Sequence, residues 1–479
     1  MKGKNDLIKS GAVYTILGFL PTASRFFLFP LFLHYLSPDD FALISLNTMV
    51  ASILPTFMTL GLETSMNRFY FDFLKYPKIE NVFVSTLIIS ISCFAILLGL
   101  IFLGVGPQLF IHSFKSHRFS FFPFGISALL NAIPAGLYSL YLNYLRCRKD
   151  IRNYAILNLG LFILTSLGEI AGIVFLKLHV EQLIWIRPAI TWGVVIVATS
   201  LILWKTGVHF EQRLLRIALK YSTPLLPHLI FGLVFIYADR IMIENNLNLT
   251  YLAIYNLTMA LSNIIDIFEQ ALRNATFPNI YRLLKENVYT NIEPIGRIHT
   301  VNGLSLMVIM ASVSLMTPVA VFYFLKPIYQ PLVYLVPFAL IISAIRFYYN
   351  VYAEPLFFFK RVSYISTATF IQGVFAILLN FLLIPRWGLM GALLANITSK
   401  FIQVCFIYFI TLTINAFRYK LAFILASMFT MIVIFILVSF SSRLSMDNKA
   451  LTHLVSCIPI LFVACIVSYA FYQKKLVSI

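Results

Sequence analysis

The chain is divided into long apolar segments that are separated by short polar connectors. A helix that crosses the hydrocarbon core of a bilayer needs about 20 mostly apolar residues, and segments of that length recur from residue 10 to residue 471. Apolar residues make up 60% of the 479 residues and charged residues 11%, whereas soluble domains carry about 25% charged residues. The mean hydropathy of +0.89 leaves too little polar surface for several soluble domains. We therefore predict an all-α polytopic membrane protein.

The segments predict about 14 transmembrane helices. Their approximate limits are 10–35, 41–63, 81–105, 121–145, 153–176, 183–204, 221–243, 251–273, 301–325, 333–355, 363–385, 387–411, 421–441 and 451–471. The two narrowest junctions contain the turn-forming strings SPDD at 37–40 and PRWG at 385–388. The connectors are too short to fold as catalytic domains, so any function must be built from the helices.

Basic residues are concentrated on one side of this arrangement. With the N-terminus inside, most of the 36 Lys and Arg residues fall in inner segments, such as 68–78, 146–152, 205–220 and 273–297. Cytoplasmic loops carry this excess in membrane proteins. We predict that both termini are cytoplasmic. The same asymmetry accounts for the net charge of +18, so we expect no nucleic-acid partner.

The sequence predicts no disulfide framework, no zinc site and no nucleotide-binding loop. The five cysteines have no paired spacing, which argues against a disulfide framework and a zinc site. The sequence has no GxxxxGK[ST] loop for nucleotide phosphates. We therefore predict no metal and no cofactor.

An offset of 211 residues aligns two parts of the chain. It places the string FALISL at 41–46 over LAIYNL at 252–257, and Lys9 over Lys220. Spans 1 to 6 then correspond to spans 7 to 12, and spans 1 and 7 each carry two prolines, namely Pro21, Pro30, Pro224 and Pro227. Parallel repeats of this kind are a transporter architecture, although chance similarity between apolar helices is the alternative. The predicted parts are an N-terminal lobe at 1–212, a C-terminal lobe at 213–415 and two extra helices at 416–479.

Five groups of short strings follow one another between residues 8 and 412. They are SRF at 24–26 with YLSP at 35–38, GLE at 61–63 with NRFYF at 67–71, YLRCR at 144–148 with NYA at 153–155, LKYSTPLLP at 219–227 with ADRI at 238–241, and NFLLIP at 380–385 with GA at 391–392. In this order they resemble the Wzx-type polysaccharide-export flippases, a branch of the superfamily that also contains lipid II flippases and multidrug and toxin extruders. The chain departs from that pattern at Ala42 and at Ser222-Thr223, where relatives often carry Gly.

The resemblance implies two six-helix lobes around a central cavity, with helices 13 and 14 added. It further implies a non-enzymatic carrier of the bacterial inner membrane, which flips undecaprenyl-pyrophosphate-linked oligosaccharide by alternating access for O-antigen or capsule synthesis. The implied partners are this lipid-linked glycan, membrane lipids and, as candidates, polysaccharide polymerase or assembly proteins.

Ionisable residues at membrane depth are costly and mark candidate sites. The deep ones are Arg25, Arg346, Lys400 and Glu169. We predict that their charges line the cavity, where the basic groups would meet pyrophosphate oxygens. Pairing of these bases with a buried acid such as Glu169 is the structural alternative.

A second set of charges is predicted to have a secondary role. Arg187, Arg240 and Asp239 fall near outer ends, where a long basic side chain can extend to the interface. Asp266 and Glu269 are spaced i, i+3 and so share one helix face.

Two other functions remain open. A cation-coupled multidrug extruder would need a deep carboxylate in the first helices, where the sequence places Arg25, but Glu169 keeps this alternative open. A membrane glycosyltransferase or polymerase also handles lipid-linked glycans, yet such enzymes usually need a large outer loop or paired acids at the surface, and the outer loops here are short.

Overall fold

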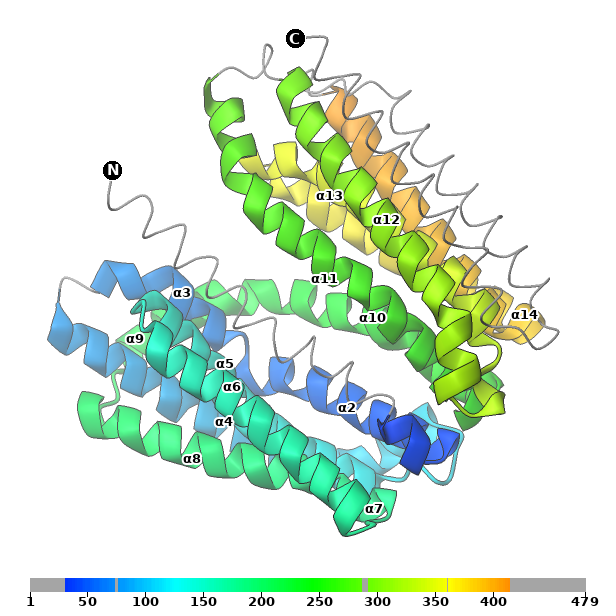
Figure 1. The fold of residues 1–479 in the computed structure, drawn as a ribbon. Coiled ribbons are helices and arrows are strands. Elements are labelled where there is room, and N and C mark those ends of the chain that lie inside the picture. Colours follow the sequence, from blue (N-terminus) through cyan, green and yellow to red (C-terminus); the bar gives the residue numbers. More distant parts are fainter. Residues whose placement is uncertain (1–30, 74–75, 287–291, 360, 414–479) are drawn as a thin grey trace. The chain divides into compact units, whose positions relative to one another are not determined.

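The computed structural model describes residues 31–73, 76–286, 292–359 and 361–413 of the chain. Regular structure in these residues is helical, and no strand occurs among them (Figure 1). The predicted spans 421–441 and 451–471, and all but the last residues of the span 10–35, lie outside the described residues. The predicted class, an all-α polytopic membrane protein, is confirmed.

The chain forms two compact units, Met1–Ala253 and Ile254–Ile479. The described helices of the first unit are α2 (Pro38–Thr59), α3 (Leu62–Phe73), α4 (Pro77–Ser113), α5 (Ile126–Cys147), α6 (Ile151–Ile170), α7 (Val180–Leu183), α8 (Ile186–Thr206), α9 (Gln212–Ser222) and α10 (Leu226–Asn246). A π-helical segment precedes α5 (Phe121–Gly125) and another follows α6 (Ala171–Phe175).

The helices described in the second unit are fewer and longer. They are α11 (Leu249–Glu286), which crosses the division between the units, α12 (Ile292–Phe324), α13 (Leu332–Phe358) and α14 (Val362–Thr413). In the first unit, α9 contacts α3 and α4, and α10 contacts α2. The lobe boundary predicted between 212 and 213 stays a prediction.

Nine of the described helices are long and apolar enough to cross a bilayer, and the bent pair α9–α10 makes up to ten. The bend of 41° lies at residues 225–229, next to Pro224 and Pro227, as expected where proline removes a helical hydrogen bond. The presumed counterparts Pro21 and Pro30 lie outside the described residues. If α14 is counted as two crossings, each predicted span between residues 41 and 411 corresponds to a helix of the structure.

The helix α3 was not predicted. The span expected at 41–63 ends earlier, because Leu60 and Gly61 both have positive φ angles. The backbone therefore leaves helical geometry, and α3 begins as a separate helix at Leu62. Its side chains Leu62 and Met66 pack into a buried cluster with Leu87 of α4 and Tyr141 of α5.

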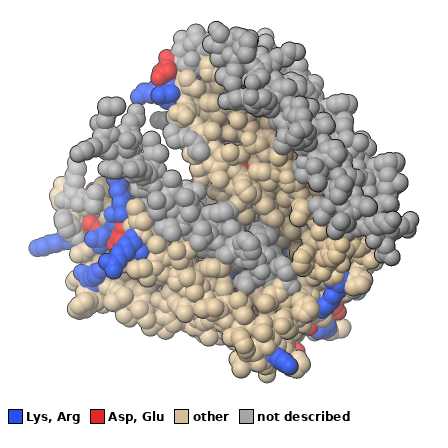
Figure 2. Space-filling model, viewed as in Figure 1, with Lys and Arg blue, Asp and Glu red and all other residues tan. Residues whose placement is uncertain are grey.

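The sides of the helices carry the apolar surface that a bilayer requires. On α4, the side chains of Leu97, Leu100 and Ile101 are more than half exposed. Figure 2 shows Lys and Arg side chains of the first unit gathered over the α3 end and near α7, whereas the helix surface visible in tan between these ends carries none. This distribution suits contact with lipid along the helices and with water at their ends.

The break inside α14 lies where the sequence places a turn. Gly388 has φ 56° and ψ −134°, which is not helical. A Cβ atom on Gly391 would lie 2.2 Å from the carbonyl oxygen of Leu383. The two segments of α14 therefore come so close at this turn that only glycine fits at residue 391.

We predict that Gly391→Ala destabilises the protein by about 1 to 3 kcal/mol, because the new methyl group meets backbone that cannot rotate away. Thermal unfolding in detergent measures the effect. The control is Gly104→Ala on α4, where an added Cβ meets nothing within 4 Å. That variant should melt at or above the wild-type temperature. Equal melting of the two variants would refute the close approach.

Candidate functional site

A row of polar side chains joins α11 to α13 in the second unit. The Ser262 hydroxyl donates to the carbonyl of Ala339 at 2.8 Å and lies 3.0 Å from the Ser343 hydroxyl. These three residues begin the row, which continues one helical turn at a time. We call it the α11–α13 ladder.

The next two steps of the ladder involve charged groups. Arg346 donates from Nη1 to Oδ2 of Asp266 and forms an ion pair with it. One turn further, Asn350 donates from Nδ2 to Oε1 of Glu269 at 2.9 Å. Along the ladder, the residue numbers of α11 and of α13 rise together, so the two helices run in the same direction. Asp266 and Glu269 share one face of α11, as the sequence predicts.

The far end of the ladder contains additional ionisable groups. Arg273 Nε lies 3.9 Å from Glu269 Oε1. Glu354 follows Asn350 by one turn of α13. Its Oε2 atom lies 3.5 Å from Nε2 of His299, which belongs to α12. The side chains of His299 and Glu354 are 9% and 7% exposed. Three carboxyl groups and two guanidinium groups are thus gathered along one helix pair, together with a histidine.

Sequence reasoning did not select His299. The corresponding span was predicted to begin at residue 301, after His299. In the structure, α12 begins at Ile292 and includes it. A histidine at this position was therefore assigned to the connector. Helix periodicity does not mark such an end, because the apolar run begins several residues after the helix does.

Arg346 is the predicted deep base whose partner the structure identifies. Its partner is Asp266 and not Glu169, which lies on α6 of the first unit. The Arg346 side chain keeps 38% exposure, and a guanidinium group carries five N–H donors. Arg346 is therefore neutralised by one carboxylate and retains donors for another acceptor.

The remaining predicted residues lie elsewhere. Half-buried Lys400 belongs to α14, half-buried Glu169 to α6 and half-buried Arg187 to α8. Arg25 lies outside the described residues.

Asp239 and Arg240 form an ion pair near the end of α10. Arg240 Nη1 lies 3.2 Å from Asp239 Oδ1, and the side chains are 17% and 6% exposed. The Arg240 guanidinium also lies over the ring of Tyr237 at 5.2 Å. These contacts favour internal pairing over extension of Arg240 to the interface.

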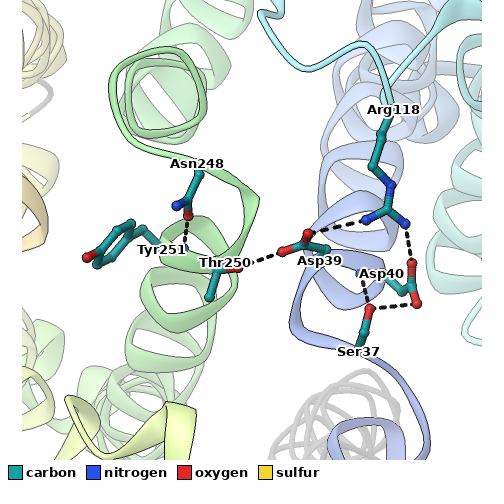
Figure 3. A network of polar contacts seen from close by, with 7 residues as sticks. All are labelled: Ser37, Asp39, Asp40, Arg118, Asn248, Thr250 and Tyr251. Carbon is teal, nitrogen blue, oxygen red and sulfur yellow. Dashed lines mark hydrogen bonds and ion pairs between the residues drawn. The ribbon is translucent and has the colours of Figure 1, made fainter.

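A second polar network lies in the first unit, and Figure 3 shows it. Arg118 donates to Asp39 Oδ2 at 3.2 Å and to Asp40 Oδ1 at 2.8 Å. Thr250, in the first turn of α11, donates to Asp39 Oδ1 at 2.6 Å. Ser37 caps α2 by accepting the amide of Asp40 at 3.1 Å. We call these five residues the Arg118 network.

The sequence interpretation of residues 37–40 as a turn was incomplete. Residue 37 is the cap of α2, and Asp39 and Asp40 form its first turn while their carboxylates bind Arg118. Asp39 and Thr250 are 211 residues apart, which is the offset of the internal repeat. If the predicted repeat holds, two equivalent helix starts are in direct contact.

Neighbouring contacts reinforce the Arg118 network. The Glu244 carboxylate accepts the backbone amides of Lys115 at 3.1 Å and Ser116 at 2.6 Å. Asn245 donates from Nδ2 to the carbonyl of Ser113 at 2.9 Å. The end of α10 and the start of α11 are thereby bound to α2 and to the loop 114–120.

Comparisons with solved structures identify the fold. The lipid II flippase MurJ in its inward closed conformation matches 98% of this chain and 99% of its own, with a TM-score of 0.71 and 13% identity. The Vibrio cholerae MATE transporter VcmN in the bent form matches 87% of this chain and 100% of its own, with a TM-score of 0.55 and 13% identity.

A multidrug resistance MATE family transporter of the MOP superfamily, in an outward-facing conformation, matches 85% of this chain and 94% of its own, with a TM-score of 0.54 and 12% identity. No protein-family model and no curated protein matches the chain. At these identities the likeness establishes the fold alone, which this chain shares with the lipid II flippase and the MATE transporters.

We predict that Arg346→Ala and Asp266→Ala each cost about 1 to 3 kcal/mol of stability, because either change leaves a charge without its partner in a membrane helix. The double variant should cost less than the sum of the two. Unfolding in detergent measures this double-mutant cycle. The control pair is Arg68–Asp72 on α3, whose side chains are 52% and 53% exposed and whose loss should cost about 0 to 1 kcal/mol. Strict additivity at Asp266 and Arg346 would contradict the pairing.

Proposed function

We propose that the protein is a transporter that flips an undecaprenyl-pyrophosphate-linked oligosaccharide from the cytoplasmic to the outer leaflet of the bacterial inner membrane. The process would supply polysaccharide synthesis, such as that of O-antigen or capsule. The observation that carries the proposal is the fold match with a lipid II flippase over 98% of this chain. Both termini would be cytoplasmic.

The extent of the match favours a lipid-linked substrate. The lipid II flippase covers more of this chain than the two MATE transporters, which cover 87% and 85%. The short predicted outer loops also leave no place for a separate enzymatic domain. These two points, together with the ordered strings of the sequence, support a flippase over a glycosyltransferase.

Arg346 is the described residue that we propose for contact with the pyrophosphate. It lies near the middle of the predicted span 333–355, and Asp266 holds one of its N–H groups. Its remaining donors suit the oxygens of a phosphate, for which guanidinium offers paired hydrogen bonds. Arg25 and Lys400 are proposed to add positive charge, and Glu169 to hold one of these bases.

A cation-coupled multidrug extruder is the second candidate. The observation that favours it is the composition of the α11–α13 ladder, where Asp266, Glu269 and Glu354 outnumber the guanidinium groups of Arg273 and Arg346. Buried carboxylates in membrane helices serve as cation or proton sites in many carriers. An acidic ladder would suit a positively charged substrate.

We predict that proteoliposomes without ATP move a polyprenyl-pyrophosphate-linked oligosaccharide to the opposite leaflet when an ion gradient is present. An external lectin that captures the exposed sugar measures the rate. Arg346→Gln should slow it by about 10 to 100-fold, because a charge-assisted hydrogen bond to phosphate is lost. Arg68→Gln, on the exposed surface of α3, is the matched control and should leave the rate unchanged.

The same vesicles separate the two candidate functions. Efflux of a cationic dye, without movement of the glycan, would favour the extruder. A rate equal to that of protein-free vesicles, or an absolute need for ATP, would refute the flippase.

We further propose that the Arg118 network opens and closes during transport. It lies on the predicted outer side, where it binds the α10–α11 connection to α2. Alternating access requires contacts on one side of the membrane to break while those on the other side form. Its side chains suit reversible contacts, because Arg118 and Asp39 are 53% and 37% exposed and such ion pairs contribute only about 0 to 1 kcal/mol.

We predict that Arg118→Ala raises the reactivity of a cysteine at position 116 with a membrane-impermeant thiol reagent. The expected increase is about two- to fivefold, since the ion pairs with Asp39 and Asp40 are both lost and such exposed pairs contribute little. The Ser116→Cys reporter keeps its backbone amide for Glu244 and is placed in a background without the five native cysteines. Arg68→Ala removes a comparable pair on α3 and should leave the reactivity unaltered. The same reactivity with and without Arg118 would show that the network does not restrict access.

A further inference from the structure

The first unit contains a groove between α6 and α8 with a cavity volume of about 770 Å³. Its walls are apolar along most of their length and include Leu157, Leu161, Val194 and Leu201. We call it the α6–α8 groove. Neither the α11–α13 ladder nor the Arg118 network contributes to it.

Glycines determine where the two helices touch and where they separate. A Cβ atom on Gly168 of α6 would lie 2.8 Å from the Ile190 side chain of α8, so the helices are in close contact there. At Gly160 of α6 and Gly193 of α8, an added Cβ would meet nothing within 4 Å. Both of these glycines line the groove, which therefore widens away from the contact at Gly168.

The wall residues are available to a ligand. Val197 and Leu201 of α8 are 59% and 54% exposed, and Ile156 of α6 is 61% exposed. All three line the groove. In a bilayer such surface is in contact with hydrocarbon, and a groove of this volume falls within the range of about 300 to 1,000 Å³ that is typical of small-molecule sites.

Basic groups lie at the open end of the groove. Arg148 and Lys205 line it together with Asp150 and Asn153. The Arg148 guanidinium donates to Tyr144 Oη at 2.7 Å and lies 5.5 Å from the centre of that ring. These contacts orient the guanidinium while leaving most of its donors for another acceptor.

Asp150 offsets only part of this positive charge. Its carboxylate caps α6 by accepting the backbone amide of Asn153 at 3.1 Å and its side-chain amide at 2.6 Å. Burial raises the pKa of Asp150, but the hydrogen bonds with Asn153 and the positive charges of Arg148 and Lys205 together lower it. The carboxylate is therefore ionised at neutral pH, and among the residues that line the groove end two cations face one anion. Glu80 of α4 also interacts with Arg148 from outside the groove lining.

We propose that the α6–α8 groove binds one anionic phospholipid, with an acyl chain along the apolar walls and the headgroup phosphate at Arg148 and Lys205. Guanidinium and ammonium groups both bind phosphate oxygens. The basic end lies in the segment 146–152 that the sequence places on the cytoplasmic side, where anionic lipids give the membrane surface a negative potential. Charge complementarity thus selects an anionic lipid over a zwitterionic one.

Native mass spectrometry of the full chain, titrated in detergent with phosphatidylglycerol or phosphatidylcholine, tests the proposal. We expect one molecule of phosphatidylglycerol to bind more tightly than phosphatidylcholine. The double variant Gly160→Leu/Gly193→Leu fills the open space and should weaken phosphatidylglycerol binding by about tenfold, which corresponds to the loss of roughly two buried methylene contacts. The control is Gly104→Leu on α4, which also adds a side chain in open space but outside the groove, and it should bind as the wild type does.

Charge variants keep the test independent of folding. Arg148→Gln and Lys205→Gln should each weaken phosphatidylglycerol binding by about fivefold and leave phosphatidylcholine binding unchanged. Arg216→Gln, which removes an exposed charge on α9, is the matched control. Equal affinity for the two lipids, or unchanged binding in the filled and charge variants, would overturn the proposal. So would tighter binding of polyprenyl phosphate, because the occupant would then be an isoprenoid chain.

Discussion

Hydrocarbon offers no hydrogen bonds, and the described structure follows from that constraint. Every backbone amide and carbonyl in a span must find its partner within the protein, which leaves the helix as the unit of construction here. Side-chain hydroxyls obey the same rule, since Thr165, Thr258 and Ser90 each donate to the carbonyl four residues earlier. Such bonds satisfy polar groups without requiring a second helix. Contacts between helices are then needed chiefly for charged and amide side chains.

The α11–α13 ladder meets that need in the second unit. Its steps follow the helical repeat, so two helices that run in the same direction place one polar residue opposite another at each turn. Removing a single step leaves its partner in an apolar environment, and a charge there is far more costly than in water. The ladder therefore determines the register of α11 against α13. It also explains how three carboxyl groups are retained in membrane helices.

Substrate and fold are separate questions for this chain. Its fold is shared by a lipid II flippase and by MATE transporters, and one fold supports different substrates through its side chains. The charges on the described helices point in two directions. Arg346 offers donors to an anion, whereas Glu269 and Glu354 place two further carboxyl groups along the same ladder. The choice between a lipid-linked glycan and a cationic substrate therefore rests on few groups, and transport measurements will decide it.

The sequence alone was sufficient for the helical class and for most spans, because the hydrophobic length of a bilayer crossing is a local property. It also predicted the turn at residues 385–388 and the shared face of Asp266 and Glu269, which depend on turn chemistry and helical periodicity. Three-dimensional structure was needed to find Asp266 as the partner of Arg346, Arg118 as the partner of Asp39, and the groove between α6 and α8. These features join residues from about 80 to 211 positions apart or depend on where two helices separate. Local patterns contain no information about such distances, because packing between helices decides them.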